Sequence, residues 1–106
     1  MWLAFLVLSS AGGAVLESAP VKGSVNVAGN SLATGKLTLH SENGQFHGST
    51  IRKGKYAIDL VPIGKFTATI EGEGVPTKYS SKETSALTVE VVEGANFFVF
   101  ELRKND

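Results

Sequence analysis

Two histidines and a glutamate lie around one Asn-Gly pair: His40, Glu42 and His47 flank Asn43-Gly44. Asn-Gly is a strong signal for a β-hairpin with a two-residue turn, because both central positions of that turn need a positive φ. Counting outward from the turn places His40 opposite His47, on the outer face with Glu42. Cross-strand neighbours have Cβ atoms about 5 Å apart, so the three side chains are candidates for a metal site. Polar cover of a wet strand face is the simpler explanation, and we predict no metal.

Other catalytic chemistry finds little support in the residues. The chain has no cysteine, so thiolate nucleophiles and cysteine metal sites are excluded. Serine and threonine are plentiful, but there is no Gly-x-Ser-x-Gly motif, and both histidines lie beside one turn. Glu71 and Glu73 are paired carboxylates in a glycine-rich stretch, where two such acids are usually only solvated. We therefore predict no catalytic residue, no cofactor and no enzymatic activity.

The charge balance narrows the class of partner. Ten basic and ten acidic side chains cancel, which argues against a nucleic-acid partner. With 106 residues, 42% of them apolar, the chain has the size and composition of one small folded domain.

The elements that must position these residues are strands. Apolar and polar residues alternate in short segments separated by turn residues, and no helix of ordinary length is indicated after residue 16. The expected strands lie at residues 21–27, 36–40, 45–49, 55–60, 65–70, 87–91 and 97–102. In the last of these, Phe97 and Val99 load one face while Phe98 and Phe100 load the other, which predicts a central strand. Seven short strands indicate an all-β sandwich or barrel.

The predicted core follows from the apolar face of each strand. It consists of Val25, Leu37, Leu39, Phe46, Tyr56, Ile58, Phe66, Ile70, Leu87, Val89, Phe98 and Phe100.

The longest stretch without a period runs from residue 71 to residue 85. Loops of this length in a small domain are often functional, and Val75, Pro76 and Tyr79 give this one apolar character. We keep these three as candidate partner-binding residues. The alternative, which we favour, is that they pack the loop against the end of the sheets.

Three groups of residues carry a family resemblance. They are Val21-Lys-Gly23-Ser-Val25, Gly54-Lys-Tyr56 and Pro62-x-Gly64-x-Phe66-x-Ala68, supported by residues 75–96. Together they resemble carboxypeptidase regulatory-like domains, a transthyretin-like (prealbumin-like) family found in small exported bacterial proteins. The resemblance covers residues 20–102 and implies a seven-stranded Greek-key-type β-sandwich. One departure is Lys53, where an acidic residue is common in the family.

Two relatives of that fold offer specific chemistry for comparison. Hydroxyisourate hydrolases end in Tyr-Arg-Gly-Ser, and this motif is absent here. Adhesin domains of the Cna-B type carry a Lys-Asn isopeptide bond, for which Lys22 or Lys36 with Asn96 would be the partners. Exposed lysines and a turn asparagine are the simpler explanation for these residues.

The N-terminal segment resembles an export signal. An apolar run at residues 2–8 passes into small residues at 9–14, as in a signal peptide, although no basic residue precedes Lys22. We predict an export segment at 1–19 and a domain at 20–106. The alternative for the segment is a buried first element of the domain, and the missing cysteine excludes a lipid anchor on this sequence. The predicted protein is a non-catalytic exported module with a structural or binding role, in the periplasm or outside the cell. The runner-up is a small metal- or carbohydrate-binding domain that uses the 42–49 hairpin face or the 71–86 loop, and the partner would be a protein or a carbohydrate.

We predict that the mature chain begins between Ala14 and Val21, because the apolar run is followed there by small residues suited to cleavage. Mass spectrometry of the native protein measures this directly. A folded cytoplasmic product that retains Met1 would contradict the prediction.

Overall fold

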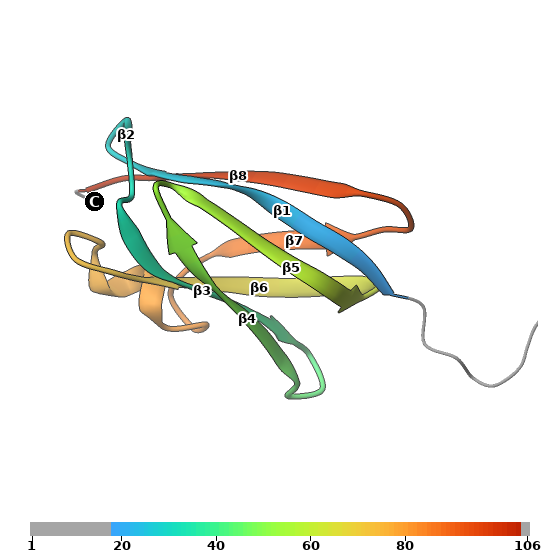
Figure 1. Cartoon of the computed structure of the whole chain (residues 1–106). Coiled ribbons are helices and arrows are strands. Elements are labelled where there is room, and N and C mark those ends of the chain that lie inside the picture. The colour runs from blue at the N-terminus through green and yellow to red at the C-terminus, as the bar shows by residue number, and fades with distance from the viewer. Residues whose placement is uncertain (1–17, 105–106) are drawn as a thin grey trace, which may run out of the picture.

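Eight strands and one short 3-10 helix make up the described part of the chain, which is residues 18–104 of the computed structural model (Figure 1). In chain order they are β1 (Ser18–Val27), β2 (Asn30–Ser31), β3 (Thr34–Ser41), β4 (Phe46–Arg52), β5 (Lys55–Pro62), β6 (Gly64–Glu71), the 3-10 helix η2 (Thr77–Ser80), β7 (Leu87–Val91) and β8 (Asn96–Leu102). The predicted all-β class is confirmed. The described residues hold no helix long and apolar enough to cross a membrane.

The predicted export segment lies mostly beyond this description. Residues 1–17 are outside the described residues, and β1 already includes Ser18 and Ala19. Ala19 is buried and pairs with Val61 of β5, so it is part of the folded sheet.

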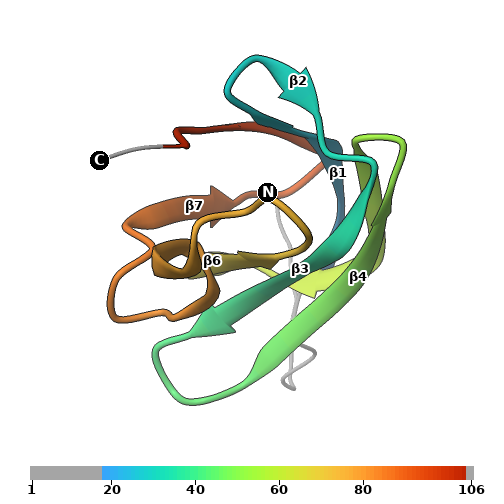
Figure 2. The same ribbon diagram turned by 90° about the vertical axis from the view of Figure 1, so that its left-hand side faces the viewer.

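All eight strands belong to one sheet. Its neighbours run in the order β2-β1-β5-β4-β3-β6-β7, and β8 pairs with β1. Every pairing is antiparallel except that of β1 with β8, which is parallel. Between β4 and β5 the only registered pair is Arg52 with Lys55, so the sheet is nearly interrupted there. The end-on view in Figure 2 shows the sheet curling round its core.

The connection from β5 to β6 carries the chain across this curl. The sequence predicts a turn at residues 61–64, whereas the structure has only a bend at Ile63 between the two strands, which are not neighbours. β5 pairs with β1, whereas β6 pairs with β3 and β7. Gly64 has a φ of 144°, a value that favours glycine, so this residue lets the chain change direction.

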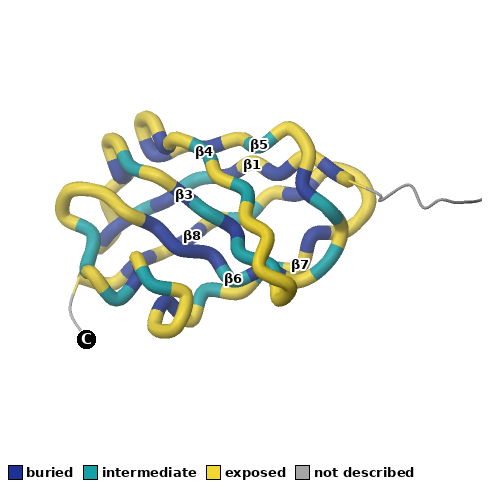
Figure 3. Tube along the Cα trace, turned by 90° about the horizontal axis from the view of Figure 1, so that it is seen from below, coloured by how far each residue is buried: buried dark blue, intermediate teal, exposed yellow. Residues whose placement is uncertain are grey.

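Most of the predicted core is confirmed, as the alternation of buried and exposed residues in Figure 3 illustrates. Buried as predicted are Val25, Leu37, Leu39, Tyr56, Phe66, Ile70 and Phe100, while Ile58, Leu87, Val89 and Phe98 are partly buried against them. The prediction is wrong for Phe46, which is 70% exposed.

A β-bulge in β5 changes which residues face inward. The pairing of β1 with β5 shifts between Ala19–Val61 and Val21–Ile58, so β5 has one more residue than β1 in this interval. An extra residue reverses the alternation beyond it. Leu60, which continues the apolar period of Tyr56 and Ile58 in the sequence, is exposed, and Val61 is buried instead.

The last strand, β8, is an edge strand and not the predicted central one. Among the described strands it pairs only with β1. Phe97 and Val99 are 64% and 48% exposed because no layer covers their face. Phe100 and Leu102, on the other face, are buried in the core.

One hydrogen bond ties three strands together across a glycine. Gly23 of β1 lies opposite Tyr56 of β5 on one side and opposite Phe98 of β8 on the other. The Tyr56 hydroxyl donates a hydrogen bond to the Phe98 carbonyl at 2.9 Å. A Cβ at position 23 would lie 1.8 Å from that carbonyl oxygen and 2.8 Å from the Tyr56 hydroxyl, so no side chain fits there. The glycine therefore makes the contact between β5 and β8 possible.

We expect Gly23→Ala to lower the free energy of unfolding by about 3 kcal/mol, because the added methyl group must displace backbone as well as Tyr56. Gly48→Ala is the matched control, since Gly48 is also inside a strand but its added Cβ would meet nothing closer than 3.4 Å. The control should unfold at the same or slightly higher denaturant concentration, as measured by urea titration. Equal stability of the two variants would contradict the close contact of β5 and β8 across Gly23.

Candidate functional site

The hairpin between β3 and β4 turns through three residues, Glu42, Asn43 and Gly44, where two are predicted. The Ser41 amide donates a hydrogen bond to the Gln45 carbonyl at 2.8 Å, which closes the loop. Gly44 has a φ of 93°, whereas Asn43 is not among the described residues with positive φ. A type I turn followed by one left-handed residue has this form. The Ser41 hydroxyl supports it by accepting a hydrogen bond from the Gln45 amide at 3.1 Å.

The extra turn residue shifts the register by one and exchanges the faces of β4. His40 lies opposite Phe46, on the outer face. His47 lies opposite Leu39, on the inner face, so the predicted pairing of the two histidines is wrong. The Nε2 atom of His47 is buried without a hydrogen-bond partner in the described structure, and its ring meets Phe66 edge-on at 6.1 Å. The proposed pair of metal ligands is thus separated, and residues 18–104 contain no group of three His, Cys, Asp or Glu side chains that could hold a metal.

A groove of about 540 Å³ lies on the outer face of β3, β6 and β7, beside the end of the long loop. We call it the outer groove. Its polar lining consists of His40, Ser41, Glu42, Lys65, Thr67, Lys82, Thr88 and Glu90. His40 and Glu42 come from the hairpin and Lys82 from the loop, so the two regions that the sequence singles out separately meet in one place.

Sequence reasoning misses most of the residues on the sheet side of this groove. Thr67 of β6 and Thr88 of β7 lie directly opposite each other, and Lys65 lies opposite Glu90. The alternation of each strand indicates that these side chains face outward. It does not indicate that β3, β6 and β7 are neighbours, which is what brings the side chains together.

His40 is held in position by a buried threonine. Its Nε2 atom lies 3.0 Å from the Thr69 hydroxyl, and Thr69 is only 5% exposed. A hydroxyl beside an imidazole is the arrangement of a nucleophile and its base. Here the hydroxyl is buried beneath the surface and cannot reach a substrate, so the contact orients the imidazole.

The charges of the outer groove balance. Lys65 and Lys82 supply two cations, and Glu42 and Glu90 supply two anions. Because the two signs alternate over one small surface, the groove has no net attraction for a polyanion or a polycation.

The loop that borders the groove is held by its own hydrogen bonds. The Ser81 hydroxyl donates to the Glu83 carboxylate at 2.7 Å, and the Glu83 amide donates back to Ser81 at 3.3 Å. The Ser81 hydroxyl lowers the pKa of Glu83 most, and its own backbone N–H lowers it further. Lys82 and His40 contribute smaller electrostatic effects in the same direction.

Tyr79 lies inward at the other end of this loop. It is 5% exposed, and its hydroxyl accepts a hydrogen bond from the Arg103 amide at 3.0 Å. It therefore joins η2 to the residue that follows β8. Val75 and Pro76 are partly buried. This geometry favours the packing alternative for these residues, and a binding role for them stays a prediction.

Asn96 also has a local structural role. Its side-chain amide donates to the carbonyls of Pro20, Val92 and Gly94 at 3.2, 2.9 and 3.1 Å, and its Oδ1 accepts from the Val92 amide at 3.0 Å. These bonds close the connection between β7 and β8 and fasten it to β1. Lys22 and Lys36, the two candidate isopeptide partners, are both exposed.

A second hollow of about 310 Å³ adjoins the first. It is lined by Lys36, Thr38, His40, Phe46 and Gly48, so His40 borders both. We call this second hollow the Phe46 hollow. Phe46 reaches it only because of the three-residue turn, and the sequence places that residue in the core.

Comparisons with known proteins bear on the fold alone. No protein-family model matches the chain, and no curated protein is similar to it. Among solved structures, the chain is similar to a DUF3823 family protein from Parabacteroides merdae, with a TM-score of 0.59 and 16% identity. The match covers 82% of this chain and 46% of that one, so the chain spans about half the length of its structural neighbour. The likeness supports a β-rich fold, and the carboxypeptidase regulatory-like family stays a prediction.

The register of the hairpin can be tested with two phenylalanines. Phe66 is 5% exposed and Phe46 is 70% exposed. Phe66→Ala should therefore cost about 3–5 kcal/mol of unfolding free energy, and Phe46→Ala less than about 1 kcal/mol, in urea titrations. A loss of several kcal/mol in Phe46→Ala would contradict this register and would support the two-residue turn instead.

Proposed function

We propose that the chain is a non-catalytic binding module of the carboxypeptidase regulatory-like type, exported to the periplasm or the cell exterior. The outer groove is the observation that supports a binding role, because it gathers polar side chains from three strands and a loop on a rigid sheet.

A transthyretin-like sandwich is the architecture that we propose for the curled sheet. The near-interruption between β4 and β5 divides the strands into a β8-β1-β5 group and a β4-β3-β6-β7 group. Residues from both groups belong to one core cluster. Two residues of the resembling motifs, Gly23 and Tyr56, are the ones that join β5 to β8, which supports the family proposal.

A non-catalytic role fits the chemistry of the groove. Its carboxylates lie on exposed strand and turn positions beside lysines, where acids are usually only solvated charges. The hydroxyl nearest to the imidazole is buried. Binding through many weak polar contacts needs neither an accessible nucleophile nor a buried acid.

The experiment blocks the outer groove with a large side chain and measures how well the protein binds to cell-envelope preparations. Labelled protein should bind to envelope preparations of the source cells, and Thr88→Arg should reduce that binding at least tenfold, since Thr88 is an exposed residue of the groove wall. Ala57→Arg, at an exposed position of β5 in the other group of strands, is the control and should bind as the wild type does. Absence of binding, or equal loss in both variants, would contradict the proposal.

A further inference from the structure

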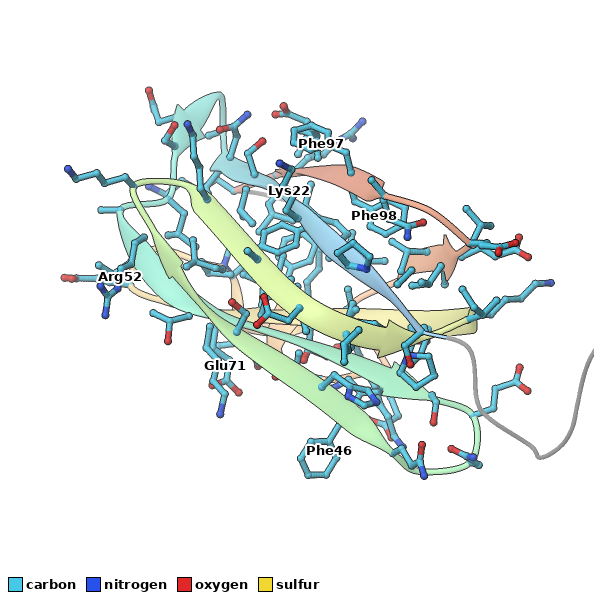
Figure 4. The ribbon with its side chains drawn as sticks, turned by 45° about the vertical axis from the view of Figure 1, so that its right-hand side comes forward. Lys22, Phe46, Arg52, Glu71, Phe97 and Phe98 are labelled. Atoms are coloured by element: carbon cyan, nitrogen blue, oxygen red, sulfur yellow. The ribbon has the colours of Figure 1, made fainter. Side chains whose placement is uncertain are left out.

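Phe46 presents a bare aromatic ring on the outer face of β4. It is 70% exposed, and Figure 4 shows it pointing away from the ribbon. The next residue on the same face is Gly48, which has no side chain to cover the ring. Its recorded ring contact is with His40, across the hairpin, at 6.4 Å between centroids and a 49° tilt. Single exposed apolar side chains are common on protein surfaces, and what distinguishes Phe46 is that its ring lines a hollow.

The walls of the Phe46 hollow are mainly apolar and carry few polar groups. Thr38 and His40 line the Phe46 hollow, and Lys36, the cation of that hollow, lies directly opposite Glu71 in the sheet. Lys65 is likewise opposite Glu90 in the outer groove. Each strand lysine that lines one of these two hollows thus lies opposite a glutamate. This pattern suits a neutral ligand and disfavours an anionic or cationic polymer.

His40 lies between the two hollows, and its imidazole is held in place there. Its Nε2 atom is engaged with Thr69 at 3.0 Å, which leaves the other ring nitrogen for a ligand. Hydroxyls of Thr67 and Thr88 continue the polar surface beyond it. A ligand that extends from the Phe46 hollow into the outer groove needs an apolar face to cover the Phe46 ring. It also needs hydroxyl groups to bind His40 and the threonines.

We propose that this face binds a neutral oligosaccharide, with one sugar ring stacked on Phe46 and the adjoining sugars hydrogen-bonded to His40 and to the threonines of the outer groove. The inference rests on the proposed binding function and names its ligand class. Sugars combine an apolar C–H face with a rim of hydroxyls, which is the combination that the surface offers. Because the charges of this face balance, we expect it to bind a neutral glycan in preference to an acidic one.

The probes are soluble neutral polysaccharides, namely xyloglucan, arabinoxylan, galactomannan, laminarin and starch, with polygalacturonate as the anionic comparison, in affinity electrophoresis and calorimetry. At least one neutral polymer should bind. Phe46→Ala should weaken that binding at least tenfold without moving the unfolding midpoint, and Phe46→Trp should retain it. Phe97→Ala is the matched control, because Phe97 is 64% exposed on β8, does not line the Phe46 hollow, and points away from Phe46 in Figure 4.

Three outcomes would overturn the inference: no binding to any neutral polymer, equal binding by Phe46→Ala and the wild type, or an equal loss in Phe97→Ala. A preference for polygalacturonate would also overturn it. If no polysaccharide binds but envelope binding still depends on Thr88, the binding module stands and its partner is a protein. If the protein binds neither a polysaccharide nor the envelope preparation, both the oligosaccharide ligand and the proposed binding function are contradicted.

Discussion

The hydrogen bond from the Tyr56 hydroxyl to the Phe98 carbonyl is the constraint on which the architecture depends. β8 is an edge strand whose registered pairing is with β1 alone, so this bond is its connection to β5. It passes over Gly23, whose missing side chain leaves the room. Burial of the phenol raises the pKa of Tyr56, so the hydroxyl stays a donor throughout the neutral range. Three strands are thereby held as one unit on one side of the core, with Phe100 at 6.0 Å from the Tyr56 ring adding an aromatic contact.

The opposite group of strands presents the candidate site, and one residue in a turn decides what it presents. With a two-residue turn, Phe46 would enter the core and the two histidines would share the outer face. The three-residue turn instead places Phe46 beside His40 on the outside and His47 beside Leu39 on the inside. The inner face of this group is well filled, since Leu37, Leu39 and Ile70 are fully buried. The site is therefore a rigid surface with an aromatic ring at one end and a balanced polar groove at the other.

The sequence predicts the strands and most of the core, because alternation survives wherever strands pair regularly, as it does in β3 and β6. It fails where one residue is inserted. The hairpin turn misplaces Phe46 and His47, and the bulge in β5 exposes Leu60. It also fails at β8, because alternation cannot distinguish an apolar face that is covered from one that is open. The outer groove is out of reach for a further reason: His40, Thr67, Lys82 and Thr88 meet only through the order of the strands, which no local pattern encodes.

The most direct test of the central constraint is the stability of the wild type and of Tyr56→Phe in urea between pH 8 and pH 11. In the unfolded chain the phenol ionises near pH 10. In the folded chain its pKa is raised by burial, so the stabilisation is fully present below pH 10 and is lost as the pH rises above it. The wild type should then lose about 1.4 kcal/mol per pH unit more than the variant does above pH 10, while the variant is less stable by about 1 kcal/mol at pH 8. Parallel curves above pH 10, with equal stability at pH 8, would show that Tyr56 does not hold β8 to β5.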